Sequence, residues 1–123
     1  MSKQKKIIIV EDDKFLTKIY RLNLENEGYK LVIVNDGKRA LDVIQTEMPN
    51  LIMLDVILPN MTGLEILDDL KKTTKLKNIP VIMLSNLGQQ KDIDKAINTG
   101  ADDYFINAEV TIEEIIKKIG EYL

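Results

Sequence analysis

The chain has no cysteine and no histidine, and these two absences exclude several kinds of chemistry. Without cysteine it can form no disulfide, no thiolate zinc site and no thiol nucleophile. Without histidine it has no imidazole base and no histidine ligand for a metal. If a phosphohistidine takes part in its function, a partner protein must therefore supply it.

Long apolar runs are also missing. No stretch approaches the ~20 apolar residues that a membrane span needs. The amino-terminal residues Met1–Lys6 lead into only four apolar residues, Ile7–Val10, which is too few for a secretory leader. We therefore expect a cytoplasmic protein with no membrane contact.

Length and charge set further bounds. The 123 residues suffice for one domain with a real core, residues 1–123, and leave no room for a second, output domain. The net charge of −3 argues against nucleic acid as a direct partner. We interpret the local basic cluster as a solvated surface. It consists of Lys71, Lys72, Lys75 and Lys77.

Short β-branched runs alternate with segments of helical periodicity. Unbroken runs of this kind are typical of strands that are buried on both faces of a parallel sheet. The predicted strands are Ile7–Val10, Leu31–Val34, Leu51–Leu54, Val81–Leu84 and Tyr104–Ile106. Strand and helix alternate five times, which predicts a single doubly wound α/β domain with helices on both faces and right-handed crossovers.

The intervening helices carry recognisable start signals. Asp13 is a predicted N-cap, and Thr62 and Thr111 each begin a Thr-x-x-Glu capping box. The apolar positions predicted for the first helix are Phe15, Leu16, Ile19, Tyr20, Leu22 and Leu24. Those predicted for the fourth are Ile93, Ala96 and Ile97.

Polar side chains follow the predicted strands at their carboxyl ends. Glu11 and Asp12 follow the first strand, Asp55 the third, Ser85 the fourth and Asn107 the fifth. The carboxyl ends of parallel strands share one edge of the sheet, where ligands bind in such folds. Clustered carboxylates repel one another, and Mg²⁺, which takes carboxylate, water and phosphate oxygens, relieves that repulsion. The sequence therefore predicts a magnesium site at this edge.

Asp55 is the predicted functional centre. It ends a buried strand, where a charge is costly unless it is paired or metal-bound. The alternative, that Asp55 only caps a helix or turn, is less plausible because the next helix begins only at Thr62. Considered alone, Glu11-Asp12-Asp13 could be a solvated turn, and Ser85 could be a simple helix cap. Their predicted position at the same edge of the sheet as Asp55 favours a functional site.

At this point the chain resembles the receiver domain of bacterial two-component response regulators, such as the chemotaxis response regulator. Four segments carry the resemblance: Val10–Asp13, Asp55–Gly63 with its Asp-x-x-x-Pro-x-x-x-Gly pattern, Ser85, and Gly100–Tyr104. It covers all five strand–helix units and implies a flavodoxin-like sheet of order 2-1-3-4-5.

The resemblance also implies residue roles. Asp55 would be the phosphoacceptor, and Ser85 the hydroxyl that bonds the phosphoryl group. Asp12 and Asp55 would bind Mg²⁺ together with the backbone carbonyl of Ile57, and Glu11 would act through water. The switch aromatic, which swings inward when the hydroxyl moves, would be Tyr104.

The family's partners follow from the same resemblance. A sensor histidine kinase or phosphotransfer protein would donate the phosphoryl group, and a downstream protein target would read the surface of the fourth and fifth helices. The chain would then be a signalling phosphoacceptor that assists its own phosphorylation and dephosphorylation, and not an enzyme. We expect a monomer or weak dimer.

One position departs from the family pattern. After the fifth strand the family has Lys-Pro, whereas this chain has Asn107-Ala108. Without proline a cis bond costs roughly 3–4 kcal/mol, so a trans peptide is expected there. A receiver-shaped interaction module that no longer switches is therefore the alternative function.

Two other functional classes of protein fit this sequence less well. Phosphatases of the haloacid dehalogenase type need a second Asp two residues after the nucleophile, and that position is Ile57. A flavodoxin-like cofactor binder would need a phosphate loop after the first strand, where Glu11-Asp12-Asp13 would repel a phosphate.

Overall fold

The computed structural model describes residues 4–123, which form five strands and five helices in strict alternation. The strands are β1 Lys6–Val10, β2 Lys30–Val34, β3 Leu51–Asp55, β4 Val81–Ser85 and β5 Asp103–Ile106. The helices are α1 Lys14–Asn26, α2 Gly37–Glu47, α3 Gly63–Lys72, α4 Gln90–Thr99 and α5 Ile112–Tyr122. The predicted alternation is confirmed.

The strands form one parallel sheet in the order β2-β1-β3-β4-β5, which confirms the predicted topology. Its register aligns the strand ends. Val10 pairs with Leu54, and Ser85 pairs with Ile106. The residues that follow β1, β3, β4 and β5 therefore emerge at one edge.

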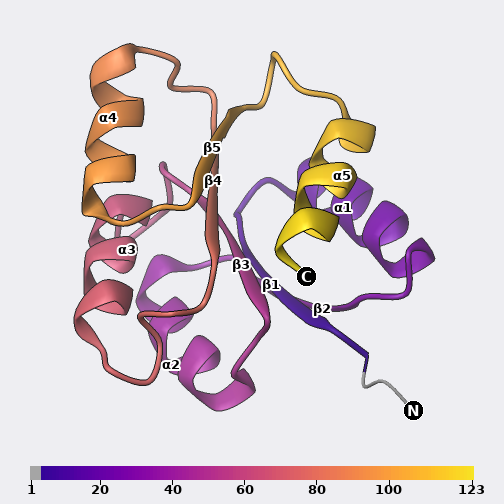
Figure 1. Cartoon of the computed structure of the whole chain (residues 1–123), viewed down its shortest axis with the longest axis horizontal. Coiled ribbons are helices and arrows are strands. Elements are labelled where there is room, and N and C mark those ends of the chain that lie inside the picture. Colours follow the sequence, from indigo (N-terminus) through magenta and orange to yellow (C-terminus); the bar gives the residue numbers. More distant parts are fainter. Residues whose placement is uncertain (1–3) are drawn as a thin grey trace.

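Helices cover both faces of the sheet (Figure 1). One apolar core lies between the sheet and α2, α3 and α4, and the other lies between the sheet and α1 and α5. Alternate residues of β3 supply both cores: Ile52 and Leu54 face one, and Leu51 and Met53 face the other. All four are fully buried, so the hydrophobic effect fixes the height at which β3 ends.

The predicted helix starts are confirmed. Asp13 Oδ1 accepts hydrogen bonds from the backbone N–H groups of Phe15 and Leu16, at 2.9 and 3.1 Å. Thr62 and Thr111 both begin complete capping boxes. Because these caps fix where α1, α3 and α5 begin, they also fix the short loops at the carboxyl edge.

Two predicted helix faces are wrong in part. Phe15 and Leu22 of α1 are 72% and 73% exposed, because Tyr20 and Leu24, one turn apart on the opposite side, form the buried face. In α4 only Ala96 is fully buried, and Ile97 is exposed. The apolar positions predicted from the sequence of these two helices outnumber those that the structure buries against the sheet.

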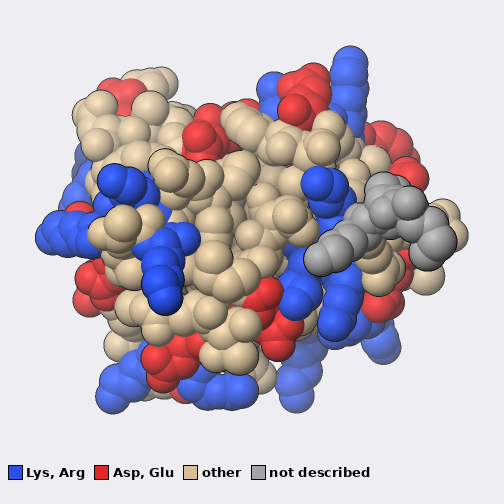
Figure 2. Space-filling view, turned by 60° about the horizontal axis from the view of Figure 1, so that its bottom comes forward, with Lys and Arg blue, Asp and Glu red and all other residues tan. Residues whose placement is uncertain are grey.

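Charged side chains of both signs are mixed on the surface. On the face seen in Figure 2, basic and acidic side chains lie interspersed around a largely uncharged centre. None of the helices within residues 4–123 has the length and apolar content of a membrane span.

The turn between β3 and α3 is held by a close backbone approach at Gly63. Its N–H donates to the Val56 carbonyl oxygen at 2.8 Å. A Cβ at residue 63 would overlap the Asp55 carbonyl oxygen and come within 2.8 and 2.9 Å of the Asp55 carbonyl carbon and Val56 Cα. Only glycine fits here without moving the strand end that carries Asp55.

We predict that Gly63→Ala lowers the free energy of unfolding by about 1–3 kcal/mol, the usual cost of overpacking. Gly120→Ala in α5 is the matched control, since open space surrounds that glycine and alanine favours helix by up to about 1 kcal/mol. Urea denaturation of both variants measures the difference. Equal stabilities of Gly63→Ala and wild type would contradict this account of the turn.

Candidate functional site

Three carboxylates meet at the carboxyl edge of the sheet. Each of Glu11, Asp12 and Asp55 has an oxygen within 4.8 Å of an oxygen of the other two. They come together because β1 and β3 are neighbours in register, so the loop after Val10 lies beside the end of β3. The structure thus brings together the carboxylates that the sequence predicted.

Glu11 is held firmly in the protein interior. It is only 3% exposed, and its own N–H extends the ladder by donating to the Val34 carbonyl at 2.9 Å. Its Oε2 accepts hydrogen bonds from the N–H groups of Asp12 and Asp13, at 3.1 and 3.2 Å. These bonds fix the carboxyl group against the backbone of the acidic loop.

Burial and crowding make full ionisation of this cluster costly. The pKa of Glu11 is raised to about 8. Burial is the largest cause, and a hydrogen bond to Asp55 and the negative charge of that residue add to it. Burial also raises the pKa of Asp55, with the negative charge of Asp12 adding to it and hydrogen bonds from Glu11 and the Ile57 N–H opposing it. Full negative charge on Glu11 and Asp55 together is therefore unfavourable, and a cation bound beside them would relieve that cost.

The carboxylates line a cleft of about 500 Å³. The lining residues are Glu11, Asp12, Asp13, Leu16, Asp55, Ile57, Leu58, Pro59, Ser85, Asn86 and Asn107. In the cleft Asp55 Oδ1 accepts a hydrogen bond from the Ile57 N–H at 3.2 Å, which fixes its rotamer. Every predicted site residue except Tyr104 lines this cleft.

Ser85 and Asn107 are joined through the backbone. Ser85 is 1% exposed, and its carbonyl oxygen accepts the Asn107 N–H at 2.9 Å. Its Oγ accepts a hydrogen bond from the Leu87 N–H at 3.0 Å, so the hydroxyl proton is left for another acceptor. The peptide between Asn107 and Ala108 is trans, as predicted, since residues 4–123 contain no cis bond.

Tyr104 lies outside the cleft and is connected to Ser85 through Leu87. Its hydroxyl donates to the Leu87 carbonyl oxygen at 2.7 Å, while the N–H of the same Leu87 donates to Ser85. Burial raises the pKa of Tyr104, so the phenol remains a donor at neutral pH. A single residue thus joins the site hydroxyl to the half-buried aromatic.

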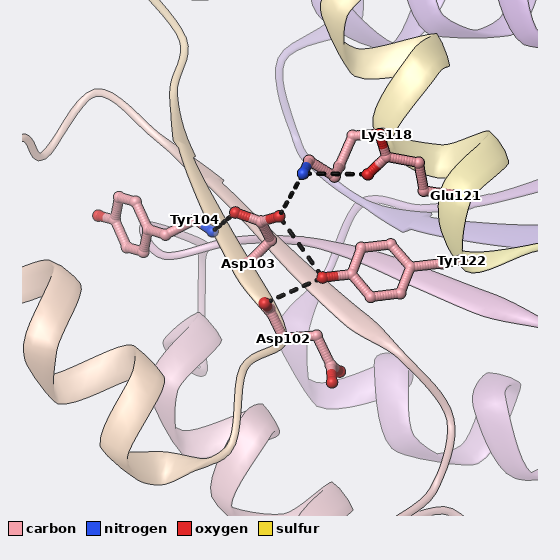
Figure 3. A network of polar contacts seen from close by, with 6 residues as sticks. All are labelled: Asp102, Asp103, Tyr104, Lys118, Glu121 and Tyr122. Atoms are coloured by element: carbon pink, nitrogen blue, oxygen red, sulfur yellow. Dashed lines mark hydrogen bonds and ion pairs between the residues drawn. The ribbon is translucent and has the colours of Figure 1, made fainter.

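The opposite face of β5 is tied to α5. Asp103 pairs with Lys118 at 3.7 Å, and the Tyr122 hydroxyl donates to the Asp102 carbonyl oxygen at 3.0 Å. Figure 3 shows the Tyr104 ring pointing away from this network, toward α4. The strand is therefore anchored on one side, and the aromatic occupies the other.

Sequence reasoning missed Tyr20, which it assigned only to the apolar face of α1. Its hydroxyl contacts Asn107 Oδ1 at 3.5 Å. Burial, with the charges of Glu11 and Asp55 adding to it, raises the pKa of Tyr20 to about 12. The available signal was the polar tip of a tyrosine on a buried helix face, which usually has a partner.

Comparison with known proteins agrees with this geometry. The family model of the response regulator receiver domain matches residues 7–120. The polar-differentiation response regulator DivK of Brucella anthropi is 32% identical over 119 residues, which are 97% of this chain and 96% of DivK. Other curated relatives are transcriptional regulatory proteins that are 35–36% identical, and this chain spans only 41–44% of their length.

Solved structures give the same result. The BeF₃-activated receiver domain of Klebsiella pneumoniae RstA superposes with a TM-score of 0.90 at 25% identity, covering 96% of this chain and 97% of that one. The Mn²⁺-bound response regulator Rcp1 superposes with a TM-score of 0.81 at 28% identity, covering 95% and 90%. Fold, site geometry, family model and relatives together establish that this chain belongs to the response regulator receiver domain family of two-component signalling.

Proposed function

We propose that the chain accepts a phosphoryl group on Asp55 from a sensor histidine kinase or phosphotransfer protein, with Mg²⁺ bound beside it. The observation that carries this proposal is the meeting of Asp55 with Glu11 and Asp12 in one cleft next to the Ser85 hydroxyl. The RstA receiver domain, which superposes closely, was solved in a form activated by a beryllium fluoride.

The donor set fits a hard divalent cation. Three clustered carboxylates, one of them with a raised pKa, are stabilised by a positive charge, and carboxylate oxygens are the ligands that Mg²⁺ prefers. We assign Asp12, Asp55 and the Ile57 carbonyl as ligands and Glu11 as a contact through water. The related Rcp1 has been solved with Mn²⁺ bound. The cation would neutralise charge on the phosphoryl oxygens during transfer.

The transfer itself needs little covalent machinery. A carboxylate oxygen of Asp55 forms a bond to phosphorus while the phosphorus–nitrogen bond of the partner's phosphohistidine breaks, and its electron pair stays on the imidazole. The product is an acyl phosphate on Asp55. The Ile57 N–H holds the nucleophile in position, and the Ser85 hydroxyl is free to donate to a phosphoryl oxygen.

The same hydroxyl provides a route to the surface. If Ser85 turns toward a phosphoryl oxygen, it loses the bond from the Leu87 N–H, and Leu87 is the residue that holds the Tyr104 hydroxyl. Tyr104 can then adopt its inward position and change the surface of α4 and α5, which a downstream protein target would read.

The alternative is a receiver-shaped module that binds partners without switching. It would apply if switching needed a positive charge at Asn107, which lines the cleft and brings none. Two of the predictions below separate the two functions.

We predict that Mg²⁺-free protein loses stability as pH rises from about 5 to 8. The pKa of Glu11 is raised from 4.5 to about 8, so over this range the folded chain holds a proton that the unfolded chain has released. Mg²⁺ at ~100 Kd should add about 2.7 kcal/mol at pH 8 and so offset part of this loss. Melting temperatures at both pH values test this, with Glu11→Gln as the control that should lack the pH slope. A melting curve at pH 8 that millimolar Mg²⁺ leaves unmoved would count against the metal site.

Asp55 should be the sole phosphorylation site. With Mg²⁺ and a small phosphodonor such as phosphoramidate, intact-mass spectrometry should detect one added phosphoryl group on wild type and none on Asp55→Asn. Asp42→Asn, an exposed change on α2, is the matched control and should be phosphorylated as wild type is. A persistent adduct on Asp55→Asn would move the chemistry to another carboxylate.

Asn107→Lys should accelerate phosphorylation and enlarge the chemical-shift changes around Tyr104 when beryllofluoride is added. The reason is that charge-assisted hydrogen bonds are roughly twice as strong as neutral ones. Asn98→Lys, exposed on α4, makes the same change in net charge away from the cleft. If wild type already switches fully and Asn107→Lys adds nothing, the lysine is dispensable here. If beryllofluoride binds wild type without moving Tyr104, the chain is the non-switching module.

A further inference from the structure

A buried tyrosine reaches the cleft from the first helix. Tyr20 is 3% exposed and packs in the core between the sheet, α1 and α5. It does not line the cleft, but its hydroxyl lies 3.5 Å from Asn107 Oδ1, and Asn107 does line it. Among the described residues no buried side-chain oxygen or nitrogen lacks a partner, and Asn107 is the side chain that satisfies this phenol.

The orientation of the Asn107 amide decides what it offers to the cleft. An asparagine side chain has an acceptor end, the carbonyl oxygen, and a donor end, the NH₂ group. Phosphoryl oxygens on Asp55 accept hydrogen bonds, so the NH₂ end would attract them and the carbonyl end would repel them. Without a fixed partner, the amide could present either end.

We infer that Tyr20 is a positioning residue for phosphorylation of Asp55, because it holds the Asn107 carbonyl oxygen away from the cleft and leaves the NH₂ group for the phosphoryl oxygens. The Asn107 backbone is fixed at the same time by its bond to the Ser85 carbonyl, at 2.9 Å. Tyr20 and Asn107 together thus form a neutral hydrogen-bond donor unit beside Asp55.

The phenol suits this task. Burial, with the charges of Glu11 and Asp55 adding to it, raises its pKa, so the hydroxyl keeps its proton and remains a donor. The 3.5 Å separation is long for an O–H···O hydrogen bond, and such contacts at reaction sites shorten when the reacting group is bound.

The inference rests on the proposed phosphorylation of Asp55, and its test is a double-mutant cycle on the rate of that reaction. Tyr20→Phe removes only the hydroxyl, and Asn107→Ala removes the amide. Phosphoramidate and Mg²⁺ are supplied to wild type, each single variant and the double variant, and intact-mass spectrometry follows the adduct. Tyr29→Phe is the matched control, since Tyr29 also packs against the core of α1 and α5.

Tyr20→Phe should phosphorylate about three- to tenfold more slowly than wild type, the range expected for one lost hydrogen bond. Tyr29→Phe should match wild type. In the Asn107→Ala background Tyr20→Phe should have no further effect, because the group that it orients is gone. In wild type the Asn107 side-chain NH₂ resonances should shift when beryllofluoride is added, and in Tyr20→Phe this beryllofluoride-dependent shift should be smaller, which loss of core packing alone would not produce.

Two results would overturn the inference: an unchanged rate in Tyr20→Phe, or an equal slowing in the Asn107→Ala background, which would assign the effect to core packing. Neither would affect the proposed function, since wild type would still be phosphorylated. If wild type itself forms no adduct on Asp55, both the proposed function and the inference about Tyr20 are wrong.

Discussion

The rest of the site depends on the crowding of three carboxylates at the ends of two neighbouring buried strands. β1 and β3 are fixed at their heights by two apolar cores, so Glu11, Asp12 and Asp55 cannot move apart to relieve their repulsion. Burial of Glu11 makes the negative charge still more costly, and the raised pKa of this residue is the direct consequence. Because the fold holds these carboxylates together, the cluster attracts positive charge. We propose that Mg²⁺ binds there and that phosphoryl transfer to Asp55 depends on it.

Few contacts separate the cleft from the surface of the protein. Leu87 links the Ser85 hydroxyl to the Tyr104 hydroxyl through its own N–H and carbonyl groups. On the far face of β5, Asp103 and Tyr122 hold the strand to α5 (Figure 3), so movement on the α4 side need not disturb the sheet. This arrangement suits a two-state switch in which one side chain moves against a fixed strand.

Much of the fold and the site could be predicted from the sequence because both depend on short local patterns. Unbroken runs such as Leu51–Leu54 identify buried parallel strands, and the shared edge of such strands then brings Glu11, Asp12 and Asp55 together. The buried face of α1 could not be predicted, since Phe15 and Leu22 are as apolar as the residues that pack, and only the neighbouring elements decide which side is covered. For the same reason the contact between Tyr20 and Asn107, 87 residues apart, has no local signal.

The central claim is that Asp55 carries the phosphoryl group beside a cation bound by its neighbours, and a crystal structure with Mg²⁺ and beryllofluoride tests it most directly. The account predicts beryllium bonded to a carboxylate oxygen of Asp55, with Mg²⁺ bound by Asp12, Asp55 and the Ile57 carbonyl oxygen. It also predicts the Ser85 hydroxyl and the Asn107 NH₂ group on the fluorines. Beryllofluoride bonded to another carboxylate, or an Asp55 adduct with no cation between it and Asp12, would contradict it.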